Sequence, residues 1–273
     1  MEDSAFLRIV MSGESIVIRF SILGSGSSGN AILVVTPGAK ILIDCGFSLR
    51  QLQERAALVG ERLDGLDAVF VTHEHGDHVK GLGVLARKLR IPVFMTRATC
   101  EGLPTSVADV PNVECFTAGD SIGLDGLTVS SFSVSHDAGD PVGFSISCDG
   151  AKLGIAADLG HAPQLVRVRL QGSHALVLES NYCPELLRKG PYPLPLQQRI
   201  RGKMGHLSNE DMSTLLAALV HDQLRLVVFN HISAENNNPA LVLEMARRVM
   251  RNSRAELVVA QQHQPTRVFE VAS

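Results

Sequence analysis

The feature that most constrains this chain is a cluster of three histidines and one aspartate within six residues. It follows the apolar stretch 66–71 and reads Thr72-His73-Glu74-His75-Gly76-Asp77-His78-Val79. Imidazole and carboxylate groups are costly to bury without partners, but they are ligands that zinc, manganese and iron accept. In a loop leaving a strand, His73 and His75 can face one ion while Asp77 and His78 turn toward a second. The run therefore predicts a dinuclear metal site.

The composition agrees with an intracellular enzyme. A chain of 273 residues with 45% hydrophobic residues can bury one large core or two small ones. The net charge of −3 argues against a globally basic nucleic-acid binder, so any such contact needs a local patch. The five scattered cysteines favour reduced thiols over disulfides. No apolar run approaches the roughly 20 residues that span a bilayer, so we expect no membrane contact.

Short β-rich runs alternate with helical patterns, and no linker divides the chain. We expect residues 1–14 to form a loose leader and residues 15–273 a single α/β domain. Two sheets with helices outside them, a four-layer αββα sandwich, is the natural packing for this order. The expected strands are 16–23, 31–35, 40–44, 68–72, 92–96, 113–116, 127–134, 142–148, 152–156, 175–179, 225–230, 256–260 and 267–271. The expected helices are 49–59, 79–89, 162–171, 209–220 and 239–252.

Two local signals refine this pattern. Asp149-Gly150 favours a type I′ hairpin turn between its flanking strands. The proline-rich stretch 191–195 predicts a rigid extended loop.

The residues alone also suggest a hydrolytic chemistry. Two divalent ions about 3.5–4 Å apart can bridge a hydroxide and present it to a phosphodiester. Asp77 would orient this nucleophile. His206 is the candidate that protonates the leaving oxygen, because it directly precedes a helix with Ser208 as its expected N-cap and Asp211 three residues on. The amino end of such a helix also offers free N–H groups to a phosphate.

Two further segments are candidates for substrate contacts. The glycine- and serine-rich loop 24–30, with Ser27, Ser28 and Asn30, could form an anion-binding nest of backbone N–H groups. Residues 186–209 contain five basic residues and no acidic one, and Tyr192 lies among them. This segment could follow a nucleic-acid backbone and stack one base. Its expected contacts are Arg199, Arg201 and Lys203.

The pattern of strand, turn and histidine-rich loop resembles the metallo-β-lactamase-fold hydrolases from about residue 20 to the carboxyl end. The resemblance implies the remaining metal ligands. His136 matches the third histidine of the first metal, Asp158 the carboxylate that bridges both metals, and His231 the last ligand of the second. Each ends or follows an expected strand, so one edge of the sandwich could gather all of them.

A narrower resemblance is to the YycJ/VicX (WalJ) group. It rests on sequence motifs in distant parts of the chain, at residues 21–30, 81–87, 133–138, 179–181, 205–211 and 231–237. It implies a cytoplasmic metal-dependent phosphodiesterase with 5′-to-3′ exonuclease action on DNA, and it makes Asn181 a candidate substrate contact. One departure is Tyr182, where many members have a histidine.

Several alternatives stay open. A small-molecule hydrolase on the same fold, such as a thioesterase, a lactonase or a cyclic-nucleotide phosphodiesterase, would use the same hydroxide, although the basic segment argues against it. A non-catalytic regulatory module is disfavoured by the complete ligand set. Nitrogen and oxygen ligands admit zinc or manganese, and iron is also compatible. The sequence leaves open the polarity of digestion, the choice between DNA and RNA, and the oligomeric state.

Overall fold

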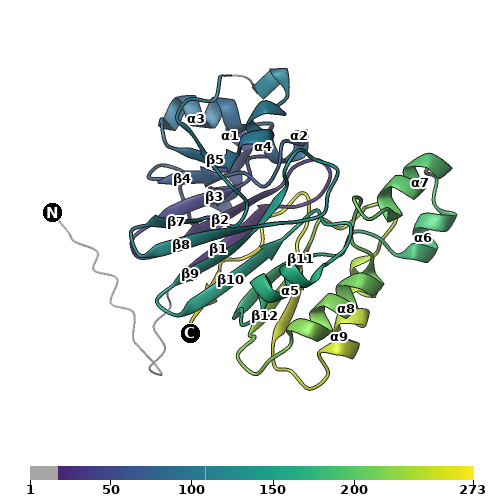
Figure 1. The fold of residues 1–273 in the computed structure, drawn as a ribbon. Helices are drawn as coiled ribbons and strands as arrows, with labels where there is room; N and C mark the ends of the chain where they lie inside the picture. Colours follow the sequence, from purple (N-terminus) through teal and green to yellow (C-terminus); the bar gives the residue numbers. More distant parts are fainter. Residues whose placement is uncertain (1–17, 108) are drawn as a thin grey trace.

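The computed structural model describes residues 18–107 and 109–273, and two mixed seven-stranded sheets dominate them (Figure 1). In the first sheet the order is β14-β1-β2-β3-β4-β5-β6. The pairs from β14 to β3 are antiparallel and those from β3 to β6 are parallel. The strands are β1 (Ile18–Gly24), β2 (Ala31–Val35), β3 (Lys40–Ile43), β4 (Ala68–Phe70), β5 (Val93–Thr96), β6 (Val113–Phe116) and β14 (Phe269–Val271).

The second sheet has the order β13-β12-β11-β10-β9-β8-β7. Here β7 to β10 pair antiparallel and β10 to β13 pair parallel. Its strands are β7 (Ser121–Leu124), β8 (Leu127–Ser133), β9 (Val142–Cys148), β10 (Ala151–Ala156), β11 (Ala175–Glu179), β12 (Leu226–Asn230) and β13 (Glu256–Val259).

Helices cover the outer face of each sheet, which gives the four layers αββα (Figure 1). On the first sheet lie α1 (Leu49–Leu58), α2 (Gly76–Val79), α3 (Leu82–Leu89), α4 (Arg97–Glu101) and the short 3₁₀ helix η1 (Thr105–Val107). On the second lie α5 (Gln164–Leu170), α8 (Asn209–Leu219) and α9 (Pro239–Val249). Two more helices, α6 (Pro184–Lys189) and α7 (Leu194–Arg201), project beyond the layers as an arm (Figure 1).

The core explains why the short strands are so apolar. Successive side chains of a strand point to opposite faces, so in β4 Phe70 enters the space between the sheets while Val69 packs under the helices. Between the sheets Phe70 meets Phe144 of β9 edge-to-face, with ring centroids 5.8 Å apart. Both faces of the central strands are thus covered, and such strands read as continuous hydrophobic runs.

The expected αββα architecture is confirmed, and so are most strands. The hairpin at Asp149-Gly150 is confirmed as well, since both residues have the positive φ that a type I′ turn requires. The expected leader, residues 1–14, lies outside the described residues. Within the described residues, no helix has the length and apolarity to cross a bilayer.

Two expectations were wrong in detail, and some elements were not predicted. The helix expected at 79–89 is split into α2 and α3 around Lys80 and Gly81. The stretch 191–195 is extended only as far as Pro193, because α7 begins at Leu194 with Pro195 in its first turn, where a proline costs no hydrogen bond. The sequence patterns also did not predict β7, α4 or α6.

Candidate metal centre

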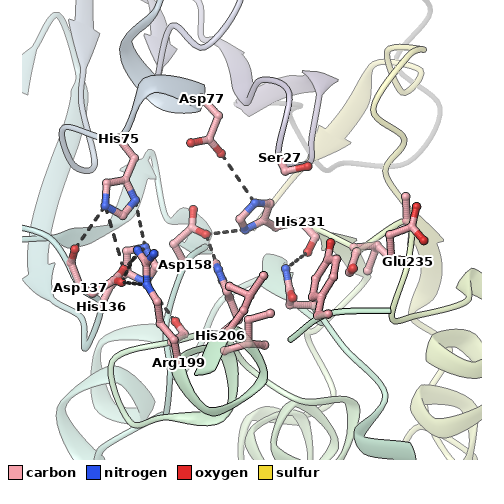
Figure 2. Close-up of a pocket in the computed structure, with 18 residues that line it drawn as sticks. Ser27, His75, Asp77, His136, Asp137, Asp158, Arg199, His206, His231 and Glu235 are labelled. Carbon is pink, nitrogen blue, oxygen red and sulfur yellow. Dashed lines mark hydrogen bonds and ion pairs between the residues drawn. The ribbon is translucent and has the colours of Figure 1, made fainter. Parts of the chain in front are cut away.

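The predicted metal ligands come from loops that leave the strands at one edge of the sandwich. The histidine-rich run follows β4, His136 follows β8, Asp158 follows β10 and His231 follows β12. Strands β10, β11 and β12 are parallel, so their carboxyl ends meet at the same edge. Figure 2 shows the Asp158 carboxylate facing both His231 and His206, with Asp77 and His75 facing it from the first sheet.

A first group of donors consists of His73, His75 and His136, whose nitrogen atoms lie within 4.8 Å of one another. Each ring has one nitrogen within hydrogen-bonding distance of a neighbour outside the group. His73 Nδ1 is 3.0 Å from the Thr72 hydroxyl, His75 Nε2 is 3.2 Å from the Asp137 carbonyl and His136 Nδ1 is 3.0 Å from the Gly205 carbonyl. Such contacts fix the orientation of each ring and its tautomer.

The other nitrogen of each ring points into the group. His73 Nε2 is buried without a hydrogen-bond partner, and His75 Nδ1 lies 3.3 Å from His136 Nε2. Three converging nitrogens suit a zinc or manganese ion.

A second group forms around Asp158. The Nε2 atom of His78 is 2.8 Å from Asp158 Oδ2, and Nδ1 of His231 pairs with Asp158 Oδ1. Neither carboxylate oxygen has a hydrogen bond of normal geometry. Burial would raise the pKa of Asp158, but His231 and His78 hold it well below its ordinary range. Asp158 belongs to two groups of donors whose atoms lie within 4.8 Å of one another, one with His73 and His78 and one with Glu179, His206 and His231. Its carboxylate therefore lies where it can serve two ions.

Asp77 faces this second group from a more open position. Its Oδ2 atom is 3.5 Å from His78 Nε2 and 3.8 Å from His231 Nε2, and its side chain is 23% exposed. The side-chain amide of Asn30 donates to the same oxygen at 3.1 Å. Asp77 is thus held beside the second group, with one side open to the pocket.

The buried donor atoms fit divalent ions well. Oriented imidazoles with a free nitrogen and a carboxylate with unsatisfied oxygens are what a metal ion requires of its site. The backbone supports the same view: Asp44, Asp158 and His231 have φ values of 61°, 49° and 51°. Residues other than glycine rarely adopt this left-handed conformation, and strain of this kind concentrates at functional sites.

Two buried carboxylates of the site were not predicted as site residues. Asp44 follows β3, and its Oδ2 atom lies 2.8 Å from Nδ1 of His78 while Thr72 donates to the same carboxylate. Glu179 ends β11 and is fully buried, and its Oε1 atom lies 2.7 Å from Nδ1 of His206 and 3.2 Å from Nδ1 of His231. The signal that could have found them is a lone carboxylate at the end of a buried strand.

The Glu179 contact orients His206 toward the pocket. Its Nδ1 atom is occupied by the carboxylate, which leaves Nε2 free on the other side of the ring. Burial alone would lower the pKa of His206, but the Glu179 carboxylate outweighs it and raises that pKa above its ordinary value. The predicted N-cap after His206 is confirmed, since the Ser208 hydroxyl accepts from the Asp211 N–H at 3.0 Å.

A pocket of about 510 Å³ opens onto these groups (Figure 2). Of the predicted substrate contacts, Ser27, Asn181 and Arg199 line it. Asn181 donates to the His231 carbonyl at 2.8 Å. The remaining four do not line it: Asn30 is buried behind Asp77, and Ser28, Arg201 and Lys203 are exposed elsewhere. Tyr182 is buried and likewise lies outside the pocket lining.

The expected anion-binding nest in the loop 24–30 finds little support in the hydrogen bonds. The N–H groups of Gly26, Ser28 and Gly29 donate to Asn30 Oδ1, Gln262 Oε1 and the Gly26 carbonyl. Those of Ser25 and Asn30 also donate within the protein. The loop therefore faces the pocket with the Ser27 side chain rather than with a row of backbone donors.

Comparison with known proteins places this site in a family. The model of the beta-lactamase superfamily domain matches residues 39–232. The exodeoxyribonuclease YycJ of Bacillus anthracis is 34% identical over 222 residues, which cover 81% of this chain and 84% of that protein. The chain belongs to the YycJ/WalJ family of the metallo-β-lactamase superfamily. A second member, the exodeoxyribonuclease WalJ of Streptococcus pneumoniae, is 31% identical over 87% of this chain and 88% of its own length.

Solved structures agree on the fold. The metallo-beta-lactamase fold protein YhfI from Bacillus subtilis superposes with a TM-score of 0.71 at 16% identity, over 93% of this chain and 99% of that one. A diphosphatase of the PhnP family gives a TM-score of 0.65 at 18% identity, over 95% of this chain and 100% of that one. The predicted resemblance is thus confirmed, and this member of the YycJ/WalJ family is a metal-dependent hydrolase.

Proposed function

We propose that this protein is a dinuclear-metal phosphodiesterase that removes nucleotides from DNA in the 5′-to-3′ direction. The observation that carries the proposal is the carboxylate of Asp158 between two groups of donors, with the His206–Glu179 pair facing the same pocket. Paired ions with a positioned proton donor are the machinery of phosphodiester hydrolysis.

His73, His75 and His136 would hold one ion, and Asp77, His78 and His231 the second, with Asp158 shared between them. Zinc or manganese suits these donors, and iron is also compatible. When bound, the ions would supply an activated water and positive charge for the phosphoryl oxygens.

The protein's own groups would divide the remaining work. Asp77, held by Asn30 and open to the pocket, orients the attacking water. His206 stands at the pocket with Nε2 free, where it can give a proton to the leaving oxygen. Glu179 keeps the ring in place and stabilises its protonated form, in the way that a carboxylate orients a catalytic histidine.

The choice of DNA rests on the relatives. Both YycJ of B. anthracis and WalJ of S. pneumoniae are exodeoxyribonucleases, and this chain covers more than four fifths of each. Arg199 at the pocket adds a cation suited to a phosphate.

The direct test uses metal-stripped protein, re-supplied with manganese or zinc, and 5′-phosphorylated DNA labelled at the 3′ end. We expect a ladder of fragments shortened progressively from the 5′ end. The Asp77→Ala variant should produce none.

Matched substrates separate the alternatives. If the protein digests an RNA of the same sequence and leaves the DNA intact, its substrate is RNA rather than DNA. If neither nucleic acid is cut while a generic phosphodiester or thioester is hydrolysed, the protein is a small-molecule hydrolase and the proposal is wrong.

A further inference from the structure

The arm formed by α6 and α7 presents an apolar face to the pocket. Tyr192 precedes α7, and Leu196 and Ile200 lie one turn apart on the helix, so the three follow one another at intervals of four residues. All three line the pocket and are half-buried. No residue of α7 is fully buried. This face therefore contributes to the pocket wall rather than to the hydrophobic core.

The rest of the lining is largely polar. It includes His75, Asp77 and His206, where the donor groups converge. The pocket thus offers polar groups to an anionic, metal-binding group and an apolar face to a flat group. A volume of about 510 Å³ falls within the range that holds a single drug-sized ligand. One nucleotide, with its phosphate and its base, matches both features.

We propose that Tyr192 stacks on the base of the terminal nucleotide while Leu196 and Ile200 pack against it. This base enters the site unpaired. The inference rests on the proposed function and specifies its substrate as a frayed or single-stranded DNA end. Aromatic rings stack on every type of base because each base has a π-face. The chain has no tryptophan and two tyrosines, of which Tyr182 is buried, so Tyr192 is the aromatic residue placed for this role.

Pairing would conflict with this arrangement. The pocket volume of about 510 Å³ matches one nucleotide, so we infer that a base held against α7 enters without its complement. Enzymes that act on a base in a pocket meet the cost of unpairing it, and that cost is least at single-stranded or mismatched positions.

Arg199 places a positive charge beside the stacking face. It is on the same helix, and its guanidinium pairs with Asp137 at 2.6 Å while 65% of its side chain stays exposed. A phosphate entering the pocket can take the place of Asp137 as its partner. The arm therefore offers both a stacking surface and a cation to the same nucleotide.

The test measures stacking directly, with the metal-loaded enzyme. The probe is a single-stranded oligonucleotide with a 5′-terminal 2-aminopurine and phosphorothioate linkages that resist cleavage. Stacking quenches 2-aminopurine fluorescence, so binding to the wild type should quench it. Tyr192→Ala should abolish the quench and weaken binding roughly 5- to 150-fold, the range found when a stacking residue is truncated. Tyr192→Phe should retain both.

Two controls make the result specific. Leu194→Ala, on the same helix but 65% exposed and outside the pocket lining, should behave as the wild type. An oligonucleotide whose 5′ residue lacks a base should bind the wild type and Tyr192→Ala equally.

The requirement for an unpaired end has a test of its own. The wild type should digest DNA ends with a 5′ overhang faster than blunt ends.

Each remaining outcome counts against the inference. If the wild type digests DNA while Tyr192→Ala keeps the quench and the affinity, the stacking role is wrong and the nuclease function stands. Equal rates on blunt and overhanging ends would contradict the requirement for an unpaired end. If the wild type neither binds nor digests DNA, the proposed function fails and the inference fails with it.

Discussion

At the scale of single residues, the centre depends on contacts that hold each histidine ring in one orientation. Asp44 occupies Nδ1 of His78 and Glu179 occupies Nδ1 of His206. Partners of this kind fix the ring that binds a metal or moves a proton, and they matter nearly as much as the ligands themselves.

Replacing Glu179 by glutamine tests this dependence. Glutamine keeps the shape but loses the charge that stabilises protonated His206, so kcat should fall by at least about 10²-fold, the lower end of the contribution of a general acid. Steady-state kinetics on labelled DNA would measure the change. Glu235→Gln is the matched control, because Glu235 lines the same pocket at an exposed position. Equal losses in both variants would contradict a specific role for Glu179.

A glycine beside the histidine-rich run gives a second prediction. A Cβ on Gly46 would stand 1.7 Å from the Asp77 carbonyl oxygen, a distance that forces the backbone to move. Gly46→Ala should therefore displace Asp77 and cost roughly 1–3 kcal/mol of stability, as overpacking does. Denaturant unfolding and metal content would report both effects.

The control lies within the run itself. A Cβ on Gly76 meets nothing within 4 Å, so Gly76→Ala should leave stability and metal content nearly unchanged. A stable, metal-loaded Gly46→Ala protein would show that the close contact does not position Asp77.

The sequence predicted these residues unevenly, for a physical reason. His73, His75, Asp77 and His78 are neighbours in the chain, so their shared chemistry is visible as a pattern. Glu179 has no local partner: it meets His231 because β11 and β12 lie side by side, with Glu179 opposite Asn230 in register. Only the pairing of strands brings Glu179 to the site, and the residues around Glu179 do not predict that pairing.

At the scale of elements, the arm is the part that the sequence patterns misjudged. Prolines at 191, 193 and 195 suggested an extended loop, yet proline is well tolerated at a helix start, and α7 begins beside two of them. Helices α6 and α7 are also short and lack the long apolar stripe of a core helix, so hydrophobic periodicity gave little sign of them. By contrast α8 carried a clear signal, the serine at its N-cap.

Helix α8 supports a prediction about stability. Ser208→Ala removes the side-chain acceptor of the Asp211 N–H and should cost about 1 kcal/mol. For a chain of this size that corresponds to a fall in Tm of about 2–4 °C. Thr214→Ala, at an exposed position within the same helix, is the control and should change Tm less. Calorimetry would separate the two, and equal shifts would mean that the cap contributes nothing particular.

At the scale of the whole molecule, the candidate ligands tie the two sheets together. His73, His75, Asp77 and His78 leave the first sheet, while His136, Asp158 and His231 leave the second. An ion bound by both sets stabilises the packing of one sheet against the other, because only the folded chain brings the sets together.

Metal removal should therefore destabilise the fold as well as end activity. An ion present at 100 times its Kd adds about 2.7 kcal/mol, so chelation should lower Tm by roughly 5–10 °C. Thermal unfolding followed by circular dichroism, with and without chelator, would measure the shift. In a His73→Ala/Asp158→Ala variant the chelator should have little effect. An unchanged Tm in the wild type would contradict bridging ligands.

The division of ligands between the sheets also has a consequence for how the protein is made. When the ribosome has released the first sheet up to β6, the histidine-rich loop is complete, but its partners from residue 136 onward have yet to follow. His231 is the last of these ligands to be synthesised. A centre that needs ligands from both sheets would therefore take up its ions only once the second sheet has been synthesised and has folded.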